Sequence, residues 1–410
     1  MISALDRKLT EQVNLVIHHP EYQALVAALP ARVDRGSGSV TVAFDPTGGL
    51  PPRVATWMPG RGCTIQPIGA PYLPVPFIHG ESSPFTAQPD SRWWPLGDDG
   101  IAPRPAPPLA ARITAAFDRS TYGKDSNTVG IVVLRDGKVV AERYRDGFGP
   151  FTANRTWSVA KSIAGTLVGL SHADPAQAAT IPEWQGSGRP DPRAAITLDN
   201  LLRMASGLHS DTAGNRTDAI YFGGTTVIEQ ATGWPLAARP GTRFRYANND
   251  ILLAIRALRQ SMGEARYGQL PPNFFSSLGM RHTVAERDWR GNHILSSQVW
   301  STARDLARLG QFWLQDGVWN GRRILPEGWM RYMTTPSGPQ PADGAGYGAT
   351  LWLFGPAQGL PAGSYAAQGN RGQYVMVIPS ERLVIVRRGE DPGSARFDIA
   401  RFAADVVAAR

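Results

Sequence analysis

The sequence predicts an α/β (α+β) fold, in which an antiparallel β-sheet is flanked by helices and joined to a mainly helical lobe. Three observations predict it. A hairpin pattern with an Asp-Gly turn occurs at residues 129–144, more strand patterns occur near the C-terminus, and helical patterns lie between these two groups. This order indicates one sheet built from both ends of the region, with the helices as an insertion.

Each element of this sheet region is predicted from its own pattern. Alternating and β-branched residues predict strands at residues 129–134, 139–144, 348–354, 374–378 and 383–387. Apolar periodicity predicts flanking helices at residues 109–117 and 395–409.

The first hundred residues read as a less regular extension. Two apolar stripes predict two short helices in the first thirty residues, and Val40–Phe44 predicts a strand. Residues 48–108 are rich in proline, glycine and tryptophan. They predict an irregular, ordered wrap, because the side chains of Trp57, Trp93 and Trp94 are costly to leave in water.

The chain length of 410 residues exceeds what a single hydrophobic core usually organises. We therefore expect three parts. Residues 1–105 would be an N-terminal extension wrapping the catalytic domain, residues 106–170 and 296–410 a sheet lobe, and residues 171–295 a helical lobe.

The composition excludes several classes of function. The formal net charge is +8, but no run of five or six basic residues occurs, so we expect a solvated basic surface and no nucleic-acid binding. Cys63 is the only cysteine, which excludes an intrachain disulfide and a cysteine-based metal site. No membrane span and no signal peptide is visible. We expect a soluble protein whose localisation the sequence leaves open: periplasmic or secreted if a leader was removed, and otherwise cytoplasmic.

Ser158 and Lys161 lie on one face of a helix that small and apolar residues predict at positions 157–169, with Thr156 or Asn154 as its N-cap. Ser158 would lie in the first turn, where free N–H groups favour negative charge. A buried lysine can act as a base toward a serine hydroxyl because desolvation lowers its pKa, whereas arginine cannot.

The scarcity of lysine makes Lys161 informative. The chain contains four lysines, Lys8, Lys124, Lys138 and Lys161, and nearly all other positive charge is arginine. The S-x-x-K pattern alone is short and occurs by chance in many chains. Two further segments therefore decide its meaning.

The second segment, residues 240–250, has a Pro-Gly turn, a short extended piece and a polar stretch before a helix. Tyr246 offers a phenol that can shuttle a proton, and Asn248 an amide that can bind both Lys161 and a substrate carbonyl. The alternative is a capped helix N-terminus with Tyr246 packed in the core.

The third segment, residues 366–374, leads into a strand. Its glycines Gly369 and Gly372 let a backbone edge approach a ligand closely, and an N–H group here could complete an oxyanion hole with that of Ser158. The alternative is an ordinary hairpin turn.

Together, in this order and spacing, the three segments resemble the β-lactamase and penicillin-binding-protein superfamily of serine hydrolases, in its class C-like branch. That branch includes esterases, D-amino-acid peptidases and 6-aminohexanoate-dimer hydrolases. The resemblance covers residues 125–410 and extends to segments 201–208, 301–310 and 321–326. It implies a β-lactamase/transpeptidase-like fold with a cleft between two lobes.

The resemblance also implies roles for individual residues. Ser158 would be acylated, and Lys161 with Tyr246 would move its proton. Asn248 would hold this network, and the N–H groups of Ser158 and Asn370, beside Gly369, would bind the oxyanion. No metal or cofactor is implied, and water would be the final acyl acceptor.

The third motif departs from the penicillin-recognising pattern. The chain has Ala367-Gln368-Gly369 where that pattern has K-T-G, and no lysine follows Lys161. In the superfamily this lysine helps to hold the carboxylate of β-lactams and peptides. We therefore expect an ester or amide substrate, as in 6-aminohexanoate-oligomer hydrolases or carboxylesterases. Arg371 could supply a charge, although strand alternation could direct it elsewhere.

Two alternatives stay open from the sequence. One is a β-lactamase or D-alanyl peptidase, and the other is a receptor that binds β-lactams or cell-wall peptides without turnover. In each case the expected partner is a small molecule, and the sequence leaves the oligomeric state open.

Overall fold

The computed structural model describes residues 28–409, except for residues 70–89 and 210–216 and the positions 30, 46, 59, 68, 186–187, 189 and 222. The two helices predicted in the first thirty residues lie almost wholly outside the described residues. Among the described helices, none is long and apolar enough to cross a membrane.

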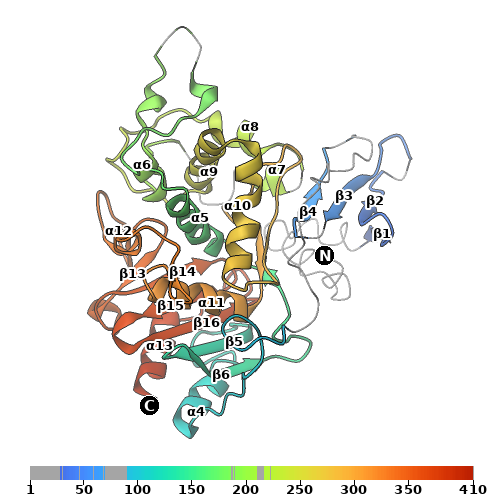
Figure 1. Cartoon of the computed structure of the whole chain (residues 1–410). Helices are drawn as coiled ribbons and strands as arrows, with labels where there is room; N and C mark the ends of the chain where they lie inside the picture. Colours follow the sequence, from blue (N-terminus) through green and yellow to red (C-terminus); the bar gives the residue numbers. More distant parts are fainter. Residues whose placement is uncertain are drawn as a thin grey trace.

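A seven-stranded antiparallel sheet forms the base of the molecule (Figure 1). Its strand order is β12-β13-β14-β15-β16-β5-β6, so the N-terminal hairpin pairs with the C-terminal strands through β16 and β5. The strands span Thr128–Arg135 (β5), Lys138–Tyr144 (β6), Gly346–Tyr347 (β12), Trp352–Phe354 (β13), Ser364–Gly369 (β14), Gln373–Ile378 (β15) and Leu383–Gly389 (β16). The predicted α/β fold with one antiparallel sheet is confirmed.

Both faces of this sheet are buried, which explains why β5 is apolar along nearly its whole length. Ile131 and Val133 pack in one cluster with helices α4 (Pro107–Ala115) and α13 (Ile399–Ala408). Val132 and Leu134 point the opposite way, into a larger cluster with α5 (Val159–Leu170) and α11 (Ala303–Leu314). Successive strand residues face opposite sides of a sheet, so one strand serves two cores.

The second lobe is mainly helical and lies above the sheet in Figure 1. Its helices are α6 (Leu198–Leu202), α7 (Asp218–Tyr221), α8 (Val227–Thr232), α9 (Asn248–Met262) and α10 (Glu264–Ser277). Helix α5 contacts both α9 of this lobe and β14 of the sheet, which places its N-terminus where the two lobes meet. The exact boundaries expected for the lobes stay a prediction.

Short strands support the entry to α5. Strand β9 (Val299–Ser301) pairs with both β7 (Asn154–Arg155) and β8 (Val284–Ala285), and β7 leads directly into the segment before α5. Between α11 and β12 the chain also forms β10 (Val318–Trp319), β11 (Arg322–Arg323) and α12 (Trp329–Thr334).

The N-terminal extension contains a separate four-stranded antiparallel sheet, seen at the side of the helical lobe in Figure 1. Its strands are β1 (Ala31–Asp34), β2 (Ser39–Val42), β3 (Arg53–Met58) and β4 (Gly62–Ile65). It contacts the rest of the chain at two points: the N–H group of Cys63 donates to the Glu286 carboxylate at 2.8 Å, and the Ile65 side chain packs so close to Gly223 that a Cβ atom there would lie 2.6 Å from it.

Two expectations for this extension were wrong. Residues 48–108 are not uniformly irregular, because β3 and β4 lie within them. The burial expected for all three tryptophans also fails, since Trp93 is 75% exposed, whereas Trp94 is partly buried and donates from Nε1 to the Gly137 carbonyl. Apolar periodicity predicts neither short strands of mixed composition nor the exposure of a single indole side chain.

Candidate active site

Ser158 occupies the N-cap position of α5, at the meeting point of the two lobes. The residue before it, Trp157, has a positive φ of 51°, a conformation that non-glycine side chains rarely adopt. This turn carries the chain from β7 into α5 and presents Ser158 to a cavity. The N–H groups of the first three residues of α5 already donate to the carbonyls of residues 156–158, so the candidate donor to an anion here is the N–H group of Ser158 itself.

The predicted N-caps were wrong. Ser158 itself takes the cap position, and its side chain makes no capping hydrogen bond. Asn154 belongs to β7, and the backbone N–H of Thr156 donates to the Val299 carbonyl at 2.7 Å. Because the Ser158 hydroxyl makes no capping hydrogen bond, it can interact with Lys161.

Lys161 is held by three oxygen atoms from three different segments. Its Nζ atom lies 2.9 Å from Ser158 Oγ and 2.9 Å from the carbonyl of Ser296, and it also hydrogen bonds to Asn248 Oδ1. The side chain is almost fully buried, with 1% of its surface exposed. All three of these oxygens can accept a hydrogen bond from an ammonium group, and the Ser158 hydroxyl can equally donate one to a neutral amine.

The pKa of Lys161 is lowered to about 7, mainly by desolvation of the buried ammonium and secondly by the positive charge of Arg155. Near neutral pH a substantial fraction of the side chain is therefore the free amine. A free amine within hydrogen-bonding distance of a serine hydroxyl can accept its proton.

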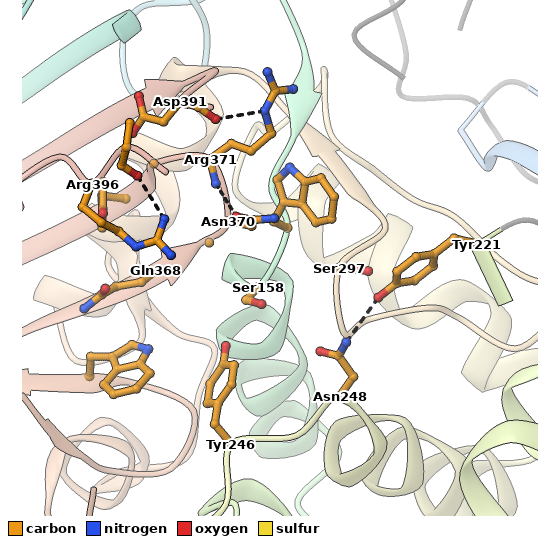
Figure 2. Close-up of a pocket in the computed structure, with 16 residues that line it drawn as sticks. Ser158, Tyr221, Tyr246, Asn248, Ser297, Gln368, Asn370, Arg371, Asp391 and Arg396 are labelled. Carbon is orange, nitrogen blue, oxygen red and sulfur yellow. Dashed lines mark hydrogen bonds between the residues drawn. The ribbon is translucent and has the colours of Figure 1, made fainter. Parts of the chain in front are cut away.

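Tyr246 lies just before α9 and directs its hydroxyl toward Ser158 (Figure 2). Burial raises the pKa of this phenol, and a hydrogen bond with Ser158 acts in the opposite direction. Its ring centroid lies 5.0 Å from Lys161 Nζ and 5.5 Å from the ring of Trp352. A neutral phenol in this position can relay a proton between Ser158 and a leaving group.

Asn248 begins α9 and links Lys161 to the helical lobe. Its Oδ1 accepts from Lys161, and its Nδ2 donates to Thr217 Oγ1 at 2.8 Å and to the Tyr221 hydroxyl at 3.4 Å (Figure 2). The amide thus positions the lysine. In this arrangement its N–H groups are directed to α7 and its flank, so the expected contact with a substrate carbonyl is not prepared.

Gly369 ends β14 directly beside the start of α5. A Cβ atom on Gly369 would lie 2.3 Å from the Thr156 carbonyl and 3.2 Å from the backbone nitrogen of Ser158. Only glycine permits this approach. Strand β14 and the turn that begins with Asn370 are thereby placed next to the Ser158 N–H group, which is the arrangement that two oxyanion-binding N–H groups need.

In the third motif the backbone approaches Ser158, whereas the side chains of Asn370 and Arg371 form hydrogen bonds elsewhere. Asn370 is exposed, and its Oδ1 accepts from the N–H of Arg371. The guanidinium of Arg371 points away from Ser158 and donates to the carbonyls of Glu390 and Asp391 (Figure 2). Its position does not support the expectation that Arg371 offers a charge to the substrate.

A cavity of about 380 Å³ lies over Ser158 and contains Tyr246, Asn248 and the third motif in its wall. Sequence reasoning missed further wall residues, among them Trp157, Tyr221, Trp352 and Arg396. Arg396 is exposed, and its guanidinium donates to the carbonyls of Gly393 and Ala395. Asp391 also lines the cavity, but the buried Arg387 binds both of its carboxylate oxygens.

The described residues contain no group of three or more potential metal-ligating side chains of the His, Cys, Asp and Glu types.

Comparison with known proteins agrees with this geometry. The model of the beta-lactamase family matches residues 113–409, which is most of the chain and includes all the segments described above. The chain belongs to the beta-lactamase family. It is a serine hydrolase of that family, and the family in general implies a small-molecule substrate.

Among relatives, the chain is 28% identical over 331 residues to a 6-aminohexanoate-dimer hydrolase of Paenarthrobacter ureafaciens, covering 72% of this chain and 81% of the relative. A structure from Bacillus anthracis, provisionally assigned as a 6-aminohexanoate-dimer hydrolase, has a TM-score of 0.59 at 22% identity and covers 69% of this chain and 78% of that one.

A class C beta-lactamase in complex with cefoxitin has a TM-score of 0.56 at 13% identity, covering 74% of this chain and 98% of that one. At such identities the two solved structures speak for the fold alone. The beta-lactamase-like fold expected from the sequence is confirmed.

Proposed function

We propose that this beta-lactamase-family protein cleaves an ester or amide bond through an acyl-enzyme intermediate on Ser158. The observation that carries the proposal is the 2.9 Å contact between Lys161 Nζ and Ser158 Oγ, made by a lysine whose pKa is lowered to about 7. A base with a pKa near the working pH combines a large free-amine fraction with enough basicity to take the proton.

The steps follow from the positions of the groups. Ser158 Oγ attacks the substrate carbonyl carbon while its proton passes to Lys161 Nζ. The negative oxygen of the tetrahedral intermediate binds the N–H groups of Ser158 and Asn370. Tyr246 donates a proton to the leaving group and is reprotonated from Lys161. Water then attacks the acyl-Ser158 carbonyl by the reverse of the same relay, which releases the acid.

The substrate class is narrowed by what surrounds Ser158. Aromatic side chains line the cavity, namely Trp157, Tyr221 and Trp352, and they suit a hydrocarbon chain. The third motif lacks a lysine, and Arg396 offers a guanidinium at the cavity wall. We therefore favour an aliphatic ester or amide that carries a carboxylate, as a 6-aminohexanoate oligomer does, over a β-lactam.

The experiment is turnover of a p-nitrophenyl acyl ester by the full chain and by its Ser158→Ala variant. We expect the variant to lose turnover almost completely while circular dichroism and melting temperature stay unchanged. Turnover at the wild-type rate in Ser158→Ala would remove the basis of the proposal.

A receptor that traps its ligand would use the same residues, and intact-mass measurement separates it from an enzyme. After incubation with the ester, a 6-aminohexanoate oligomer and nitrocefin, an enzyme returns to its original mass and releases product. A persistent adduct on Ser158, with stoichiometric release only, would instead identify a receptor.

A further inference from the structure

Arg155 is a buried cation whose position near Ser158 the mechanism above does not use. It lies in β7, three residues before Ser158, and 7% of its surface is exposed. Among the described residues no carboxylate forms an ion pair with it. Its guanidinium donates instead to Ser297, to the carbonyl at 3.4 Å and to Oγ at 3.3 Å. Burying a charge without an opposite charge is costly, so its retention calls for a reason.

The guanidinium of Arg155 is held between two aromatic walls of the cavity. It lies 3.7 Å from the ring centroid of Trp157 and 4.7 Å from that of Tyr221. These cation–π contacts compensate part of the lost hydration without neutralising the charge. The same stack braces Trp157, whose positive φ turns the chain into Ser158.

The backbone around Arg155 is fixed as well. Arg155 pairs with Trp300 across β7 and β9, and its carbonyl accepts from Nη2 of the buried Arg388 at 3.0 Å. A cation fixed at both backbone and side chain can exert a constant electrostatic effect on its neighbours, because it cannot swing away into solvent.

Arg155 and Lys161 bind adjacent residues, because the Arg155 guanidinium donates to Ser297 and Lys161 Nζ donates to the Ser296 carbonyl. They are also linked through Tyr221, whose ring lies against Arg155 and whose hydroxyl accepts from Asn248, the residue that accepts from Lys161.

We infer that Arg155 is a positioning residue whose fixed positive charge acts together with desolvation to favour the free-amine form of Lys161, and so its role as a base toward Ser158. Like charges in a dry site raise the free energy of the protonated lysine, and removal of a proton relieves this repulsion. The inference rests on the proposed function for its catalytic meaning, but the coupling between the two side chains is a property of the protein alone.

Other ionisable groups lie on α5 or on segments near it, and their effects on Lys161 have to be distinguished from the effect of Arg155. Ser158 comes from its own helix, Tyr246 precedes α9, Tyr221 comes from α7, and Asp250 lies in the first turn of α9. Burial raises the pKa of Asp250 to about 7, so a rate profile alone could confuse Asp250 with Lys161. A direct measurement on the lysine is needed.

The small number of lysines makes such a measurement practical. Protein labelled with ¹³C-lysine gives signals from four side chains, and the Lys161→Arg variant identifies the signal of Lys161. We expect this signal to titrate near pH 7 in the wild type. In Arg155→Gln and Arg155→Met the midpoint moves upward by about 0.5–1 pH unit, because the repelling charge is gone. The Met variant keeps an apolar stem against Trp157 and guards against misfolding of the Gln variant.

Controls distinguish charge from structure. Arg323→Gln removes an exposed arginine of β11 and leaves the midpoint at its wild-type value. Arg155→Lys keeps the charge, so the acid limb of its kcat/KM profile stays in place, whereas that of the neutral variants moves to higher pH with the lysine signal. Between pH 9 and pH 6 the wild type should lose about tenfold in kcat/KM, because the free amine is depleted. The neutral variants should lose about threefold to tenfold more than the wild type over the same range.

An unchanged Lys161 midpoint in the folded neutral variants would overturn the inference and reduce Arg155 to a structural brace, whatever happens to their activity. This result is distinct from a failure of the proposed function. That failure would show as full turnover in Ser158→Ala, whereas the lysine titration does not depend on turnover.

Discussion

Gly369 faces the Thr156 carbonyl so closely that a methyl group on its Cα would lie 2.3 Å from that oxygen. Both partners of this contact are backbone, so neither can rotate away. The end of β14 and the start of α5 are therefore set against each other by the absence of a side chain at one position, and the N–H groups proposed to bind the oxyanion depend on this contact.

The first prediction tests this contact. Gly369→Ala forces β14 away from α5, which misplaces the N–H groups of Ser158 and Asn370. We expect kcat/KM for a p-nitrophenyl ester to fall by about 10²–10³-fold, as when an oxyanion donor is lost. Gly149→Ala is the matched control, because no atom lies within 4 Å of the added methyl. Equal activity of the two variants would contradict the assignment of the third motif.

Substitution of Lys161 separates charge from basicity. Lys161→Arg keeps a positive charge but cannot supply a free amine near neutral pH, and Lys161→Met removes both. We expect each to lose about 10²–10⁴-fold in kcat, the usual range for loss of general-base catalysis. Lys138→Met on the exposed start of β6 serves as control. Retention of most activity by Lys161→Arg would show that the lysine acts as a charge and not as a base.

The pH dependence of kcat/KM follows from the same lysine. The free amine is the active form, so activity rises with pH through the pKa of about 7 and reaches a plateau above it. Because the pKa of Tyr246 is raised, the phenol stays protonated through this range and causes no fall at mildly alkaline pH. Measurement between pH 5 and 9 with a neutral ester checks this, and a flat profile from pH 6 to 8 disagrees with it.

For the buried Asp250 we predict a pH dependence of the unfolding free energy that is opposite in sign to that of an ordinary carboxylate. Burial raises its pKa to about 7, above the unfolded value of 3.8, so folding favours the protonated form. The stability it contributes is present below pH 4 and is lost as pH rises toward 7. Relative to wild type, Asp250→Asn should therefore gain on the order of 3 kcal/mol in unfolding free energy between pH 4 and 8.

Urea unfolding of both proteins at pH 4, 6 and 8 measures this difference. A stability difference that does not change with pH would mean that Asp250 stays ionised, held by its hydrogen bonds from Ser206.

Because the Arg396 guanidinium lies at the cavity wall, we predict that the protein prefers anionic substrates. Arg396→Gln should raise KM about tenfold for a p-nitrophenyl monoester of a dicarboxylic acid, as expected for loss of one charge-assisted hydrogen bond. The neutral p-nitrophenyl ester of the same chain length serves as control and should keep its KM. An equal effect on both esters would show that Arg396 acts through the shape of the cavity wall.

Much of the fold could be predicted because its signals are local. The Asp-Gly turn and apolar alternation at residues 129–144 correspond to β5 and β6, and β15 and β16 follow the same rule. The strand predicted at 348–354 is shorter, because Thr350 has a positive φ and the chain turns there before β13. A single residue with unusual backbone geometry leaves no mark on a hydrophobic pattern.

The site residues also divide into those whose proximity follows from local spacing and those that only the fold brings together. Ser158 and Lys161 are one helical turn apart, so their proximity could be derived from spacing. Tyr221 and Arg396 reach the cavity, and Arg155 reaches the ring of Tyr221, only through strand pairing and lobe packing, which no short motif records. The sequence pattern indicates only that Trp157 begins the helix predicted at residues 157–169, although its ring lines the cavity and its backbone conformation leads into Ser158.

The contact between the N-terminal sheet and Gly223 has a practical consequence. Ile65 and Arg53 of that sheet pack where a side chain on Gly223 would stand, two residues after Tyr221. Tyr221 in turn contacts Arg155 and accepts a hydrogen bond from Asn248, which binds Lys161. A protein engineer who trimmed the first hundred residues to obtain a minimal catalyst would thus remove packing that supports the surroundings of Lys161.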